Sequence, residues 1–348
     1  MARYQGHNEE IVADWKEEKG GIRSSQQKWA EIADAEQYSK GVMKEICQNR
    51  IVPAKRFSKL SYVRSRTYLP VALCSAFLVS MAVWAFGQTP GPVKMPPNRQ
   101  ARVLVIAQTK GFEHDSVPDA MAAIYKMGHE SRLWDTTLRS DTELITKKDP
   151  KTRNMKTLDY FDVLVFASTT GELDLADDQK RDMLSFIKDD GKGFVGIHAA
   201  LDTNYQWPEY GEMIGGWFDQ HPWMTFNAPI VLEDPNFPAV RHFPKAFVKR
   251  DEIYQAKSWS RDKVNVLLSL DPNQLDYNNN PRVHRTDRDF AVAWSKMYGK
   301  GRVFYSTLGH TKESWDDPDI QKMYFEAIKW TLGMTEGSAA THGRMNGQ

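Results

Sequence analysis

The chain has 348 residues, of which 41% are hydrophobic and 26% are charged, and its formal net charge is +1. This composition is typical of a globular protein with one large or two small domains. It excludes a collagen-like, wholly disordered or polytopic membrane protein. A net charge near zero gives no broad attraction for nucleic acid, so we expect none as a partner. The two cysteines, Cys47 and Cys74, are too few for a disulfide framework or a four-cysteine zinc site.

An uncharged apolar segment, Leu69 to Phe86, stands out from this composition. Basic residues precede it, and the small residues Ala85 and Gly87 stand just before Gln88, which is the pattern of a secretory signal with its cleavage site. The segment is also just long enough to serve as a single membrane anchor. Residues 63–87 are therefore predicted to be a signal peptide or an anchor. Under both interpretations the following domain is exported: it is periplasmic or secreted, or it is held outside the inner membrane.

Composition also predicts the other boundaries. Residues 1–62 form a polar extension without a sustained apolar face, which we interpret as a misassigned start or as the cytoplasmic tail of an anchored protein. Residues 88–100 are rich in Pro and Gly and are expected to form a linker. Residues 101–335 are long enough to bury a core and are expected to fold as one domain. The small, polar residues 336–348 are expected to be a disordered tail.

Strand and helix patterns alternate along the folded domain. Short apolar runs at 102–107, 161–168 and 191–198 predict strands that are buried on both faces. Helical patterns at 117–127 and 176–189 separate them. This alternation predicts an α/β fold, a doubly wound and mostly parallel sheet with helices on both faces. Further strands at 264–270, 290–294 and 302–306 and a closing helix at 320–332 are expected after a long middle region.

Ligands of such sheets bind outside the carboxyl ends of the strands. Four histidines follow predicted strand ends or lie in long loops, namely His114, His198, His221 and His310. We expect these histidines to share one site. Nitrogen ligands with one open position are typical of catalytic zinc, so all four are candidate ligands of a divalent metal such as zinc. No short zinc motif is present, and the metal is therefore a hypothesis from residue type alone.

The same edge of the sheet offers an interpretation without metal. His198 and Glu252 could act as general base and acid beside a carbonyl-bearing substrate, with His114 and Asp202 as further catalytic candidates. His198 stands where a strand-to-helix turn would present a nucleophile. No cysteine follows Cys74, so thiolate chemistry, and with it glutamine amidotransfer, is excluded in the exported part.

Aromatic residues around these positions suit a sugar, because aromatic rings offer large apolar faces with polar edges. The candidates for substrate binding are Phe112, Trp207, Tyr210, Trp223 and Tyr254, together with His310. Packing of a helix at 210–218 in the core explains the nearby Trp217 and Phe218 equally well, whereas Trp207 and Trp223 are the better loop candidates.

Several motifs occur in an order that resembles a known family. They are Gly-Phe-x-His-Asp-Ser at 111–116, Gly-Phe-Val-Gly-Ile-His-Ala-Ala-x-Asp-Thr at 193–203, Asp-Glu-x-Tyr at 251–254 and Leu-Gly-His at 308–310. In this combination the chain resembles the ThuA-like (trehalose utilisation) family over residues 102–334. The resemblance implies a class I glutamine amidotransferase-like, flavodoxin-like fold. It also implies an association with trehalose, related disaccharides and keto-sugars.

These observations together predict an exported protein that acts on a small sugar. The expected chemistry is isomerisation or other acid/base chemistry on a disaccharide or keto-sugar, by an isomerase or hydrolase and not a glutamine amidotransferase. The alternative is a non-catalytic carbohydrate-binding module on the same fold. An enzyme should gather the histidines and Glu252 around one pocket, whereas a binding module should disperse them behind an open aromatic surface.

Overall fold

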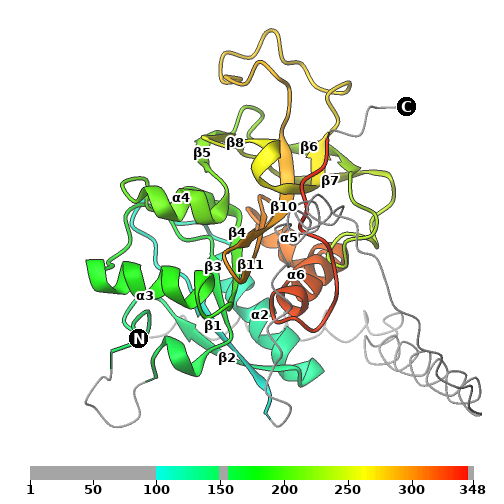
Figure 1. The fold of residues 1–348 in the computed structure, drawn as a ribbon. Coiled ribbons are helices and arrows are strands. Elements are labelled where there is room, and N and C mark those ends of the chain that lie inside the picture. Colours follow the sequence, from blue (N-terminus) through cyan, green and yellow to red (C-terminus); the bar gives the residue numbers. More distant parts are fainter. Residues whose placement is uncertain (1–98, 149–155, 344–348) are drawn as a thin grey trace, which may run out of the picture. The chain divides into compact units, whose positions relative to one another are not determined.

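The computed structural model describes residues 99–148 and 156–343, which are built around one large sheet (Figure 1). Its strand order is β2-β1-β3-β4-β11-β10-β9-β6-β7, and a separate small sheet pairs β5 with β8. The strands are β1 (Ala101–Ile106), β2 (Trp134–Arg139), β3 (Val163–Ala167), β4 (Gly193–Ile197), β5 (Trp217–Gln220), β6 (Thr225–Leu232), β7 (Ala246–Glu252), β8 (Gln255–Lys257), β9 (Asn265–Leu270), β10 (Ala291–Tyr298) and β11 (Gly301–Ser306).

The sheet has a parallel part and an antiparallel part. Strands β2, β1, β3, β4 and β11 run parallel to one another. Strands β10, β9, β6 and β7 extend the sheet, and each of them is antiparallel to its neighbour. The predicted α/β fold is therefore confirmed. The antiparallel pairing of β9, β6 and β7 was not predicted, because the pairing of distant segments leaves no local signal in the sequence.

Helices cover both faces of the parallel strands (Figure 1). Val103 and Val105 of β1 belong to the core beneath α2 and α6, whereas Leu104 and Ile106 belong to the core beneath α3 and α4. This alternation explains why the strand is apolar throughout, because side chains of a strand point to the two faces in turn. The helices are α2 (Val117–Ser131), α3 (Asp177–Lys188), α4 (Pro208–Ile214), α5 (Lys312–Asp316) and α6 (Pro318–Thr331), with short 3-10 turns η1 (Leu158–Tyr160), η2 (His198–Leu201) and η3 (Arg261–Lys263).

Residues 336–343, expected to be part of a disordered tail, instead contact the domain. The indole N–H of Trp330 donates to the carbonyl of Gly337 at 3.0 Å. The side-chain amide of Asn265 donates to the carbonyl of Ser338 at 2.9 Å. Both donors are buried in the domain, and the carbonyls of Gly337 and Ser338 supply the acceptors that they need.

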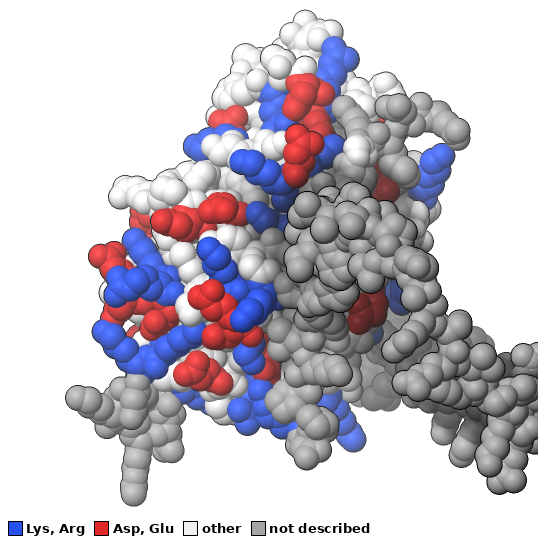
Figure 2. Space-filling view, viewed as in Figure 1, with Lys and Arg blue, Asp and Glu red and all other residues white. Residues whose placement is uncertain are grey.

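In the part of the chain that the structure describes, no helix is both long and apolar enough to span a membrane. The predicted signal or anchor at 63–87 lies outside this part, as do residues 1–62 and most of the linker at 88–100. On the face of the molecule in Figure 2, basic and acidic side chains are interspersed, in keeping with the net charge of +1.

Candidate functional site

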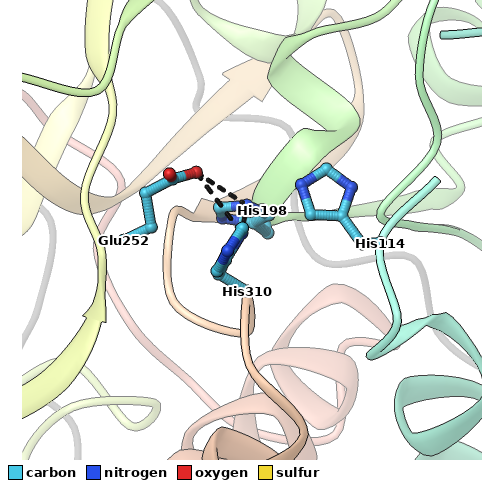
Figure 3. A group of neighbouring side chains, drawn as sticks. All are labelled: His114, His198, Glu252 and His310. Carbon is cyan, nitrogen blue, oxygen red and sulfur yellow. Dashed lines mark hydrogen bonds and ion pairs between the residues drawn. The ribbon is translucent and has the colours of Figure 1, made fainter. Parts of the chain in front are cut away.

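Four side chains from separate parts of the fold meet at one point (Figure 3). His114 comes from the loop after β1, His198 follows β4, Glu252 is the last residue of β7, and His310 follows β11. One ligand atom of each residue can be chosen so that all four lie within 4.8 Å of one another. We call these residues the His/Glu cluster. Its position agrees with the rule that parallel strands carry their sites at their carboxyl ends.

The shortest contacts in the His/Glu cluster join ring nitrogens and the carboxylate. Nδ1 of His310 lies 3.1 Å from Nε2 of His198 and 3.3 Å from Oε2 of Glu252. Nε2 of His198 is 3.7 Å from the same carboxylate oxygen. The ring of His114 stands edge-on to the other two imidazoles, with centroid distances of 4.8 Å to His198 and 5.1 Å to His310. Three imidazoles and one carboxylate oxygen therefore face a common centre.

The backbone turns sharply at His198, as expected for the residue that follows this strand. His198 has a φ of 44°, in the left-handed region, and begins the short helix η2. Gly196, two residues earlier, lets α4 pack closely on β4, since a Cβ there would lie 3.0 Å from the side chain of Ile214. The imidazole of His198 is fully buried, and its Nδ1 lies 2.6 Å from the carbonyl of Thr307. This contact assigns the proton to Nδ1 and leaves the lone pair of Nε2 directed at the cluster.

Glu252 reaches the cluster because the end of β7 is bonded to the end of β11. The hydroxyl of Thr307 donates to the carbonyl of Glu252 at 3.3 Å, and it accepts the N–H of Tyr254 at 3.0 Å. Thr307 thus holds both Glu252 and His198. Its role was not predicted, because a threonine at a strand end carries no distinctive sequence signal.

Burial lowers the pKa values of the histidines in the cluster and raises that of Glu252, so it favours the neutral form of each group. It lowers the pKa of His198 well below the usual value, and the positive charges of neighbouring histidines lower it further. Burial and the charge of His310 lower the pKa of His114 to about 4, and burial also lowers the pKa of His310. Burial, followed by the charges of Asp251 and Asp202, raises the pKa of Glu252 to about 7. At neutral pH the cluster therefore presents three uncharged imidazoles, together with the carboxyl group of Glu252, whose pKa of about 7 lies close to the pH of the solution.

His221 and Asp202 lie beside the cluster and not within it. The predicted metal ligands were His114, His198, His221 and His310, but Glu252 takes the place of His221 in the cluster. Nδ1 of His221 is 3.7 Å from Oε1 of Glu252, the other carboxylate oxygen, and the His221 side chain is 30% exposed. Asp202 accepts a hydrogen bond from the hydroxyl of Tyr205, and its charge raises the pKa of Glu252. Tyr205 was not singled out in the sequence.

The family model described as trehalose utilisation, ThuA, matches residues 102–331 of the chain.

The chain belongs to the ThuA family.

Two solved structures have a similar fold. A ThuA-like protein from Bacteroides uniformis ATCC 8492 is 21% identical, with a TM-score of 0.55, and the match covers 69% of this chain and 94% of that one. A ThuA-like protein from Parabacteroides merdae ATCC 43184 is 16% identical, with a TM-score of 0.52, and the match covers 70% and 93% of the two chains. Comparison with curated proteins gives no match.

In this ThuA-family chain an open cavity of about 410 Å³ adjoins the His/Glu cluster. His114 and His310 belong to both. Phe112 is 66% exposed at the cavity, and its ring stands edge-on to His114 with a centroid distance of 4.8 Å. The cavity is lined by Phe112, Glu113, His114, Asp115, His310, Thr311, Lys312 and Glu313. A molecule in this cavity can therefore contact an exposed aromatic face and two imidazoles at once.

The other predicted sugar-binding aromatic residues are packed inside the domain. Trp207 and Tyr210 are buried in the core beneath α4, where the Tyr210 hydroxyl donates to a backbone carbonyl. Trp223 is partly buried against Phe290, with a centroid distance of 5.1 Å. Tyr254 is also buried, although its ring lies against His198 with a centroid distance of 4.4 Å. Burial removes Trp207 and Tyr210 from the candidate site, because neither ring has a face free for a sugar.

The lowered pKa of His114 predicts a pH-dependent stability of the metal-free protein. A histidine in the unfolded chain has a pKa near 6.5, whereas that of His114 is about 4 in the fold. Below pH 6.5 protons therefore bind the unfolded chain preferentially. Protonation at His114 alone should lower the free energy of unfolding by roughly 3 kcal/mol as the pH falls to 4. Urea unfolding at several pH values measures this loss.

The matched variants are His114→Gln and, at an exposed histidine of α2, His129→Gln. The stability of His114→Gln should fall less steeply with decreasing pH than that of wild type, while His129→Gln follows wild type. Equal slopes for wild type and His114→Gln would show that His114 is not held neutral by the fold.

Proposed function

We propose that this protein is an enzyme that performs acid/base chemistry on a sugar at the His/Glu cluster, with a divalent transition metal held by the cluster. The observation that carries the proposal is the convergence of His114, His198, Glu252 and His310 beside an open cavity. The sugar is inferred from the family, which is described by trehalose utilisation. The convergence favours an enzyme over a carbohydrate-binding module, since a module has no need of four metal-ligating side chains, three of them buried, at one point.

The donor set fits a metal of the zinc type. Metal-bound imidazoles must be neutral, and the lowered pKa values keep these histidines neutral at pH 7. A second ring nitrogen bonded to a carbonyl is the usual support of a histidine ligand, and His198 has this bond to Thr307. Nδ1 of His114 is buried without a hydrogen-bond partner among the described residues. Three imidazoles and one carboxylate favour zinc or another first-row transition metal over magnesium or calcium.

The protein's own groups would supply proton transfer. A bound metal of this type contributes a Lewis acid that polarises a carbonyl or activates a water molecule. Oε2 of Glu252 faces His198 and His310, whereas Oε1 faces His221. Oε1 can therefore exchange a proton with the partly exposed imidazole of His221, while Oε2 remains directed at the cluster. Isomerisation of a keto-sugar needs a proton to be removed beside the carbonyl and returned, and this pair suits that task.

The cavity supports the assignment of substrate size. A volume of about 410 Å³ lies within the range of small-molecule sites, and a disaccharide can lie partly outside an open cavity. Phe112 offers a face for the C–H groups of one sugar ring.

We also propose that the domain is exported or anchored outside the inner membrane, which is supported by the sequence of residues 63–87 alone.

Metal binding and turnover of the full-length protein test the proposed function. We expect one equivalent of zinc or a similar metal by elemental analysis, and isomerisation or hydrolysis of trehalose-type disaccharides or their keto forms. A chelator should remove both the metal and the activity. Glu252→Gln and His198→Gln each remove a proposed ligand, so each should lower metal affinity by more than the roughly 10- to 100-fold that loss of an outer-shell partner costs.

His221→Gln is the control, because His221 touches Glu252 but lies outside the four-residue cluster. It should keep the metal and lose turnover. Retention of metal and activity by both Glu252→Gln and His198→Gln would contradict the proposal, and an equal loss of metal in His221→Gln would mean that the ligand set is wrong.

Phe112→Ala tests the sugar-binding face separately from the chemistry. Loss of one stacking contact of about 1–1.5 kcal/mol should raise KM roughly tenfold with little change in kcat or metal content. Tyr125→Ala is the control, since Tyr125 is also an exposed aromatic residue but lies on α2 against His129. Wild-type KM in Phe112→Ala would exclude this ring from substrate binding.

A further inference from the structure

The carboxylate of Asp251 is fully buried and accepts four hydrogen bonds. Its Oδ2 accepts the backbone N–H of Gly309 at 2.8 Å and the hydroxyl of Ser314 at 2.8 Å. Its Oδ1 accepts the backbone N–H of His310 at 3.0 Å and that of Glu252 at 2.8 Å. Two of these donors belong to residues of the His/Glu cluster. One carboxylate thus ties the end of β7 to the loop that carries His310.

The same loop is bonded onward to the segment that carries His114. Gly309 has a φ of 118°, which favours glycine, and its carbonyl accepts the hydroxyl of Ser116 at 2.9 Å. Ser116 stands two residues after His114. The bonds from Asp251 therefore reach, directly or through Gly309, the backbone beside three of the four cluster residues.

A contribution to the overall stability of the fold does not explain why position 251 carries an aspartate. Its four partners are neutral donors, and among the described residues no lysine, arginine or histidine forms an ion pair with it. A buried carboxylate of this kind costs desolvation that an apolar side chain would avoid. What only a carboxylate offers is two oxygens that can accept all four donors at once.

We propose that Asp251 is a positioning residue that holds Glu252 and His310 in register for a shared metal ion. This inference rests on the proposed function, because it assumes that the cluster binds metal. Asp251 acts through the backbone of its neighbours and does not itself face the cluster's common centre. Asp251 was not a candidate in the sequence, although it stands within the Asp-Glu-x-Tyr motif.

The test compares three variants of the full-length protein. Asp251→Asn keeps the shape of the side chain but replaces one acceptor oxygen with a donor, so at least one N–H or O–H loses its partner. Ser314→Ala removes one of the four donors and leaves the carboxylate in place. Asp162→Asn is the matched control, because Asp162 is also a buried aspartate but binds Arg99 and Lys192 at the start of β3.

Three readouts at one fixed pH separate positioning from a general loss of structure. They are the affinity for Co²⁺, the visible spectrum of the Co²⁺ complex, and amide hydrogen exchange of residues 309–314 without metal. Asp251→Asn should lower Co²⁺ affinity roughly 10- to 100-fold, alter the spectrum and accelerate exchange. Ser314→Ala should change all three in the same direction by a smaller factor. Asp162→Asn should match wild type in all three, even though its overall stability falls.

A folded Asp251→Asn protein with wild-type affinity and spectrum would overturn the inference. Should Asp251→Asn fail to fold, wild-type affinity and exchange in Ser314→Ala would overturn it instead. If the wild-type protein binds no Co²⁺ or Zn²⁺, the part of the proposed function that places a metal at the His/Glu cluster is wrong. Exchange of residues 309–314 then decides alone whether Asp251 holds this loop: acceleration in Ser314→Ala supports that role, and unchanged exchange contradicts it.

Discussion

The 2.6 Å contact between Nδ1 of His198 and the carbonyl of Thr307 determines what the rest of the site can do. It fixes the proton on one ring nitrogen and directs the lone pair of the other toward His310 and Glu252. The hydroxyl of Thr307 also holds the backbone of Glu252 and Tyr254. One residue at the end of β11 therefore sets both the tautomer of the central imidazole and the approach of the only carboxylate in the cluster.

The sequence names every member of the His/Glu cluster as a candidate, but it does not predict how the antiparallel strands bring Glu252 to the histidines. His114, His198 and His310 follow apolar runs that become β1, β4 and β11, and the carboxyl ends of parallel strands meet at one edge. The choice between Glu252 and His221 depends on how β7 pairs with β6, and long-range antiparallel pairing has no local signature. The candidate metal ligands predicted were all histidines, whereas the group of side chains that converges contains Glu252 and leaves His221 beside it.

Aromatic residues show a second limit of sequence reasoning. Trp207 and Tyr210 follow the turn at His198 and have the composition of a sugar-binding loop, yet α4 buries both of them. Phe112 looks no different in the sequence and remains 66% exposed beside His114. An aromatic ring satisfies a core and a binding surface equally well, so only the position of the covering helix distinguishes the two.

X-ray absorption spectroscopy of the full-length protein loaded with one equivalent of Zn²⁺ tests most directly whether the four side chains form one centre. A shared centre should give nitrogen and oxygen ligands at about 2.0–2.2 Å, with outer-shell scattering from three imidazoles. His114→Ala should reduce the imidazole count to two. A spectrum with one imidazole or none, or with six oxygen ligands, would contradict the account, because it would mean that the convergence of His114, His198, Glu252 and His310 serves something other than metal binding.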